Sequence, residues 1–184
     1  MEFFFRSNTV TIGTASVTIS SWLWGSKTNL LLVDTPGFDD AHKEAHEILA
    51  EIAEDLAGIY RSGIPIGAVI YLHRISDNRL QRGALRSISI LREIVGRQKL
   101  PSVVFATTWW DSVNEATGAK REAELSKQGN YWGSFIKGGA KVMRHNQGET
   151  SARDIMEEAI RRATWEPLQI QNEMVTEMMS FKVG

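Results

Sequence analysis

An uninterrupted aliphatic run that ends at a carboxylate constrains the fold of this chain more than any other feature. Leu30 to Val33 are four aliphatic residues in succession, the pattern of a β-strand buried on both faces. The run continues as Asp34-Thr-Pro-Gly-Phe-Asp-Asp40, where a Pro-Gly turn precedes two acids that can open a helix. Ligands of doubly wound sheets bind at the carboxyl ends of strands, so Asp34 is expected to face a metal or a phosphate. A plain strand-turn-helix with Asp39 as the N-cap fits the same residues.

The rest of the chain alternates between predicted strands and predicted helices. Residues 9–20 alternate apolar and polar side chains, which is typical of a half-exposed edge strand or a hairpin with its bend near Gly13. Further strands are predicted at 66–72, 102–107 and 141–145, and helices at 41–60, 84–95, 114–127 and from a capping-box-like Ser151 onward. This alternation favours an α/β fold with a mostly parallel sheet.

Composition excludes several function classes. The 184 residues, 42% hydrophobic and 23% charged, are sufficient for one domain with its own core. A net charge of −1 offers no basic field for nucleic acid, and the absence of cysteine excludes disulfides and zinc-thiolate sites. No segment approaches the roughly 20 apolar residues of a membrane span, and with no targeting signal the default expectation is a cytoplasmic protein. His42 and His46 have helical metal-pair spacing but no third ligand, which favours a solvated helix face.

Polar clusters recur where predicted strands end. They are Asp34–Gly37, His73–Arg79 and Thr108–Asp111, and a fourth, His145–Gly148, follows the last strand. A nucleotide site at the carboxyl edge of a parallel sheet produces this recurrence.

Three of these segments carry a family resemblance. DTPGFDD, AVIYLHRISDNR and VVFATTWWD, in this order, resemble the septin-like GTPases related to the immunity-associated group, and among them fungal G domain-containing proteins. The resemblance spans about Ser7 to Val175. It implies a three-layer α/β sandwich of the P-loop NTPase type, with a G domain over 1–165 and an amphipathic helix over 166–184.

The resemblance also implies a phosphate side to the site. Asp34 would hold Mg²⁺ through water, and the Gly37 N–H would meet the γ-phosphate of GTP, with Thr35 in the same contacting segment. Thr9 resembles the first-switch threonine that faces Mg²⁺, although a surface strand residue fits equally well.

On the base side, Asp111 would accept hydrogen bonds from guanine N1–H and the exocyclic amine, with Thr108, Trp109 and Asn146 bordering the base. Asp111 as a helix N-cap and Asn146 as a turn residue are the competing interpretations. Trp109 stands where the family has a lysine, and Trp110 follows it. Either an indole stacks on guanine, or the two tryptophans pack in the fold.

Two departures from the family bear on hydrolysis. Phe38 occupies the place of a water-orienting glutamine, and no Gly-x-x-x-x-Gly-Lys-Ser/Thr occurs in the 184 residues. The expectation is a G domain that begins near the first switch, is incomplete at its amino end and has weak or lost hydrolysis. The strand of the missing motif would lie between residues 30–34 and 66–72. Those strands then pair directly, leave a groove open, or are bridged by Met1–Phe5.

Two functions follow as expectations: a guanine-nucleotide-binding domain, or a non-catalytic GTPase remnant that serves as a protein-interaction module. A chain with no independent function is the third alternative. The face formed by Ile170, Met174 and Met178 is expected to pack on the domain. The competing interpretation is a partner helix or a homodimer contact.

Overall fold

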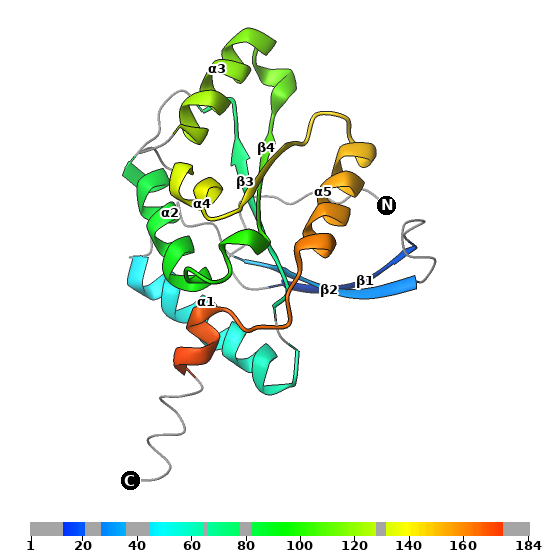
Figure 1. The fold of residues 1–184 in the computed structure, drawn as a ribbon, viewed down its shortest axis with the longest axis vertical. Helices are drawn as coiled ribbons and strands as arrows, with labels where there is room; N and C mark the ends of the chain where they lie inside the picture. Colours follow the sequence, from blue (N-terminus) through cyan, green and yellow to red (C-terminus); the bar gives the residue numbers. More distant parts are fainter. Residues whose placement is uncertain are drawn as a thin grey trace.

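The chain is an α/β protein, and its described strands form two separate sheets (Figure 1). The computed structural model describes residues 13–20, 27–35, 45–64, 66–77, 82–127 and 132–174. The elements follow in the order β1 (Gly13–Ser20), β2 (Lys27–Asp34), α1 (Ala45–Arg61), β3 (Val69–Arg74), α2 (Arg82–Val95), the 3₁₀ turn η1 (Leu100–Ser102), β4 (Val103–Thr108), the 3₁₀ turn η2 (Trp110–Ser112), α3 (Glu115–Ser126), α4 (Gly133–Lys137), β5 (Lys141–Arg144) and α5 (Glu149–Arg162).

The larger sheet is parallel, with the order β3-β4-β5. In its register Arg74 lies opposite Thr108, and Thr107 lies opposite Arg144. The carboxyl ends of the three strands therefore share one edge. The sequence prediction of an α/β fold with a parallel sheet is confirmed at this level.

Helices cover both faces of this sheet because the residues of β4 point alternately to each side. Val104 and Ala106 form one apolar cluster with Ile155 and Ala159 of α5. Phe105 faces the other side, where the cluster includes buried residues of α1, α2, α3 and α4. Figure 1 shows α5 on one side of β3 and β4, and α2 and α4 on the other.

An aromatic group fills the second cluster. The ring centroids of Phe105 and Trp132 are 4.7 Å apart in a stacked arrangement, and Phe135 meets Phe105 edge-on at 5.4 Å. Trp132 lies just before α4 and Phe135 lies within it. The sequence pattern did not predict this helix. Its five residues are too few to show an amphipathic period.

The aliphatic run occupies β2, which pairs antiparallel with β1. The prediction of a strand buried on both faces is wrong here. Leu31 is 37% exposed, and Leu30, Leu32 and Val33 are half-buried. The bend of the hairpin is also not near Gly13. Gly13 begins β1 and lies opposite Asp34, the last residue of β2, at the end of the hairpin away from the bend. The physical reason is that β2 belongs to a two-stranded hairpin and not to a sheet covered by helices on both faces.

Direct pairing of β2 with β3 is likewise wrong, because the two strands belong to different sheets. Among the strands that the structure describes, none lies between them. The third alternative is that Met1–Phe5 bridges the two strands, and these five residues lie outside the described part of the chain.

Two details of the predicted helices change. Ser151 does not cap α5, which begins at Glu149. The Ser151 hydroxyl instead accepts from the Gln147 N–H at 3.0 Å. In α2 the helical spacing of Leu85, Ile88, Leu91 and Val95 predicts one inward apolar face. Leu85 is 53% exposed, whereas the other three residues are buried.

The segment after α5 packs on the same core. Leu168 and Ile170 are buried in the cluster with α1 and α2, and Met174 packs against it. Gln171 is fully buried, and its side-chain amide donates to the Leu56 carbonyl at 2.9 Å. The packing interpretation holds for Ile170, which is covered within the chain and is not available as a dimer contact. Met178 lies outside the described residues.

A buried lysine ties the amino-terminal end of the sheet together. Lys99 Nζ donates to the carbonyls of Ile66 and Thr164, each at 3.1 Å, and burial lowers the pKa of this amine. In the part of the chain that the structure describes, no helix is both long and apolar enough to cross a membrane.

Candidate functional site at the carboxyl edge of the parallel sheet

The ends of the three parallel strands are joined by hydrogen bonds. Ile75 N–H donates to the Thr108 carbonyl at 2.9 Å, and His145 N–H donates to the Thr107 carbonyl at 2.7 Å. The Thr108 hydroxyl donates to the His73 carbonyl at 3.3 Å. The predicted clusters around His73, Thr108 and His145 are therefore brought to one edge of the molecule.

The two adjacent tryptophans have opposite surroundings. Trp110 is buried, and its indole N–H donates to the Thr107 carbonyl at 3.1 Å and to the Thr107 hydroxyl at 3.0 Å. Its ring lies so close to α3 that a Cβ on Gly118 would stand 2.6 Å from the indole. Trp110 is a packing residue.

Trp109 is 54% exposed. Its backbone has φ 62° and ψ 39°, the left-handed region, and no other non-glycine residue of the described chain has a positive φ. For a bulky residue this conformation costs about 1–3 kcal/mol, and such strain collects at functional sites. The guanidinium carbon of Arg74 lies 5.0 Å from the centroid of the Trp109 ring.

Asp111 lies in η2 and is exposed. It does not cap α3, because Asn114 occupies the N-cap and its side-chain oxygen accepts from the Thr117 N–H at 2.8 Å. The helix-capping interpretation of Asp111 is therefore wrong. Asn146 is also exposed, two residues beyond the end of β5.

The phosphate side of the predicted site lies on the other sheet. Asp34 and Thr35 are half-buried at the end of β2. In Figure 1 the hairpin extends to the right below α5, whereas β3 and β4 run toward α3. Gly37 and Thr9 lie outside the described residues, and among the described ones no group of three or more His, Asp or Glu could hold a metal.

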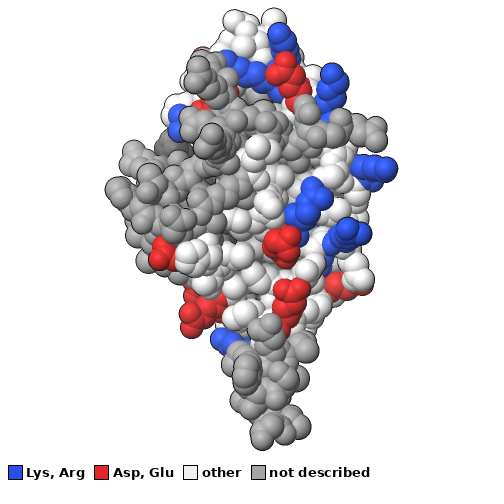
Figure 2. Space-filling model, turned by 90° about the vertical axis from the view of Figure 1, so that its left-hand side faces the viewer, with Lys and Arg blue, Asp and Glu red and all other residues white. Residues whose placement is uncertain are grey.

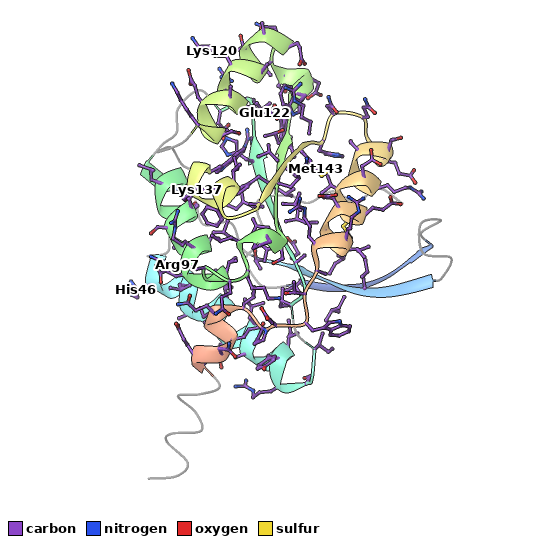
Figure 3. The ribbon with its side chains drawn as sticks, viewed as in Figure 1. His46, Arg97, Lys120, Glu122, Lys137 and Met143 are labelled. Carbon is purple, nitrogen blue, oxygen red and sulfur yellow. The ribbon has the colours of Figure 1, made fainter. Side chains whose placement is uncertain are left out.

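A hollow of about 310 Å³ lies beside the strand ends, between α3 and β5. Figure 3 shows Glu122 on α3 and Met143 on β5, which both border it. Its lining residues are Ala119, Glu122, Ala123, Ser126, Val142, Met143 and Arg144. None of the predicted nucleotide-site residues lines it.

Ion pairs fix the wall of this hollow. Arg144 donates to Glu122 at 2.7 Å and to Glu115 at 2.7 Å, and its guanidinium carbon lies 4.1 Å from the Trp110 ring centroid. The hydrogen bond to Glu122 raises the pKa of Arg144. Charges of both signs also occur on the face that Figure 2 shows, with the basic side chains mainly along one margin and the top.

The sequence interpretation did not single out two arginines at this edge, although Arg74 lies within the predicted cluster His73–Arg79. Arg74 and Arg144 are the last residues of β3 and β5, so each flanks the end of β4, where the tryptophans follow. A strand register was needed to see this pairing. The available signal was that Arg74 lies within the predicted polar cluster His73–Arg79, and that Arg144 lies one residue before the end of the predicted strand 141–145.

No protein-family model matches the chain, and no curated protein has a significant match to its sequence.

Proposed function

We propose that this chain binds guanine nucleotide as a G domain of the septin-like GTPase type, with the P-loop NTPase layout that this implies. The observation that carries the proposal is the segment after β4. It presents an exposed indole at Trp109 and an exposed carboxylate at Asp111, at the shared carboxyl edge of a parallel sheet. Neither side chain is needed for packing or capping, so both can serve a ligand.

Asp111 would select the base. A carboxylate accepts two hydrogen bonds, and guanine offers N1–H and an exocyclic amine side by side. Adenine has an acceptor at N1, so its binding would leave the carboxylate without a donor. Thr108 and Asn146 lie at neighbouring strand ends and would border the base.

Binding is a better supported proposal than hydrolysis. The phosphate-loop motif is absent from the 184 residues, and Phe38 cannot orient a water molecule. Asp34 is the one proposed Mg²⁺ ligand among the described residues, so nucleotide phosphates and water would complete the coordination. Asp34, Thr35, Gly37 and Thr9 remain the proposed contacts to the phosphates and metal.

The interaction-module alternative is favoured by a different observation. Among the described strands, β2 pairs only with β1 and β3 pairs only with β4, which leaves one edge of each strand without a described neighbour. Open strand edges are templates for a further strand. A partner strand between the hairpin and the parallel sheet would use these edges.

A titration with a fluorescent GTP analogue and Mg²⁺ tests the nucleotide proposal. Micromolar binding that GTP competes and ATP does not is the expected result. Asp111→Asn should abolish the preference for guanine, whereas Asp55→Asn, at an exposed position of α1, should leave it unchanged. No binding, or equal competition by ATP, would favour the interaction module.

A further inference from the structure

Two arginine–tryptophan pairs flank the end of β4. Arg74 closes β3 and lies over Trp109 at 5.0 Å, and Arg144 closes β5 and lies over Trp110 at 4.1 Å. The parallel register sets both pairs, because it puts one arginine on each side of the strand that leads into the tryptophans. The pairs have the same chemistry but different surroundings.

The Arg144 pair is closed. Glu122 and Glu115 hold its guanidinium, and the indole N–H of Trp110 is bound to Thr107. With Trp110 buried and the Arg144 guanidinium bound by two carboxylates, this pair serves the fold.

The Arg74 pair is open. The Arg74 side chain is 51% exposed, and its ion pair with Asp77 spans 3.7 Å. Trp109 is more than half exposed although Arg74 covers one face of its ring, so the opposite face is largely in solvent. The left-handed backbone of Trp109 holds the indole at the sheet edge at a cost in stability, while more than half of the residue stays exposed.

We propose that Trp109 and Arg74 form a stacking platform for a nucleobase, with the indole between the base and the guanidinium. Every base has a π-face, so stacking supplies affinity without choosing the base. The choice is left to Asp111. Arg74 touches the indole and not the base, so it is a positioning residue that holds the ring in place. This inference rests on the proposed function, because the ligand is the base of the same nucleotide.

The indole N–H resonance of Trp109, identified with Trp109→Phe, reports stacking directly. We expect GMP and AMP, each titrated to millimolar concentration, to shift this resonance. Trp109→Leu should weaken the binding of both nucleotides by about 5- to 150-fold, the usual effect of losing one base–aromatic stack. Trp109→Phe keeps an aromatic face and should retain most of the affinity.

Trp165→Leu is the matched control. Trp165 is 89% exposed. The N–H of the preceding residue, Thr164, donates to the Gly67 carbonyl just before β3, so Trp165 lies at the opposite end of the sheet from Trp109. Its replacement should change neither affinity. Arg74→Met should broaden or move the Trp109 resonance in the free protein and weaken both nucleotides, and Arg74→Lys should restore part of the affinity.

The outcomes separate the platform from guanine selectivity. If GMP and AMP bind equally and both shift Trp109, the platform stands and the proposed selectivity fails. If GMP binds without shifting Trp109, or Trp109→Leu weakens binding no more than Trp165→Leu, the platform is overturned while guanine binding stands. If neither nucleotide shifts the resonance, the platform is overturned.

Discussion

Two runs of four apolar residues in this chain are buried to different extents. Val103 to Ala106 in β4 are fully buried, between two strands and with helices on both faces. Leu30 to Val33 in β2 have β1 as a strand partner, and Leu31 is partly exposed. An apolar run thus predicts that a strand forms, whereas its burial depends on what the rest of the chain brings to cover it.

Removing a large side chain from β4 should have the largest effect. Phe105→Ala is expected to lower the free energy of unfolding by about 3–5 kcal/mol, because it empties the space between Trp132, Phe135 and Tyr71. Urea unfolding followed by circular dichroism measures the loss, and Phe105→Leu keeps it measurable if the alanine variant does not fold. Leu85→Ala, at an exposed position, is the control. Equal losses at both positions would contradict the placement of the core on β4.

Ion pairs stabilise α5, the helix that packs on one face of the parallel sheet. Glu158 is buried and accepts from Arg162 at 2.5 Å and from Arg161. Arg162 also donates to the carbonyls of Pro101 and Gly139, at 2.9 and 2.7 Å, which ties α5 to η1 and to the turn before β5. The hydrogen bond from Arg162 is the main cause that lowers the pKa of Glu158.

This depressed pKa gives a pH dependence with a definite sign. Because the carboxylate binds protons less readily in the folded state, its contribution is fully present above the ordinary glutamate pKa of 4.5 and is lost as the pH falls through the lower folded value. Glu158→Gln should cost about 1.5–3 kcal/mol at pH 7, and the difference from the parent protein should shrink in acid. Glu149→Gln, which breaks an exposed pair on the same helix, should show a smaller loss. A constant difference from pH 7 to pH 3 would argue against the depressed pKa.

An identical substitution in both strands compares them directly. Val104→Thr places a hydroxyl among Ala106, Ile155 and Ala159 and should cost about 1–3 kcal/mol. Val33→Thr replaces a half-buried residue of the hairpin with another β-branched residue suited to a strand, so its effect should be close to zero. Thermal and urea unfolding of the two variants give the difference. A loss at Val33 as large as at Val104 would mean that β2 is covered as β4 is.

Local signals predicted the elements well. The helices α1, α2, α3 and α5 and the strands β3, β4 and β5 follow from residues close in sequence, although the cap of α3 proved to be Asn114 and not Asp111. At the strand ends, the sequence also identified Trp109 and Asp111 as candidates. It could not predict which of the two adjacent tryptophans is buried, because both are the same residue type. Their surroundings come from residues distant in sequence: Arg74 contacts Trp109, whereas Arg144 and Gly118 lie against Trp110.

Properties set by distant parts of the chain were not predictable in the same way. The burial of β2 depended on which strands would lie beside it, and no local pattern carries that information. α4 was missed because five residues show no period, although its Phe135 completes the core around Phe105. Arg74 lay within a predicted polar cluster, but its place beside Trp109 emerged only when the register set it opposite Thr108.

The smallest expected effect is at the most exposed position of the aliphatic run in β2. Leu31→Thr keeps a residue suited to a strand and lies opposite Ser16, so the free energy of unfolding should change by no more than about 0.5 kcal/mol. Urea unfolding at several protein concentrations is the measurement. A loss of about 2 kcal/mol or more would show that Leu31 is covered in solution. If that loss grew with protein concentration, the cover would come from a second chain lying on the hairpin, and the contrast between β2 and β4 would be a property of the isolated chain alone.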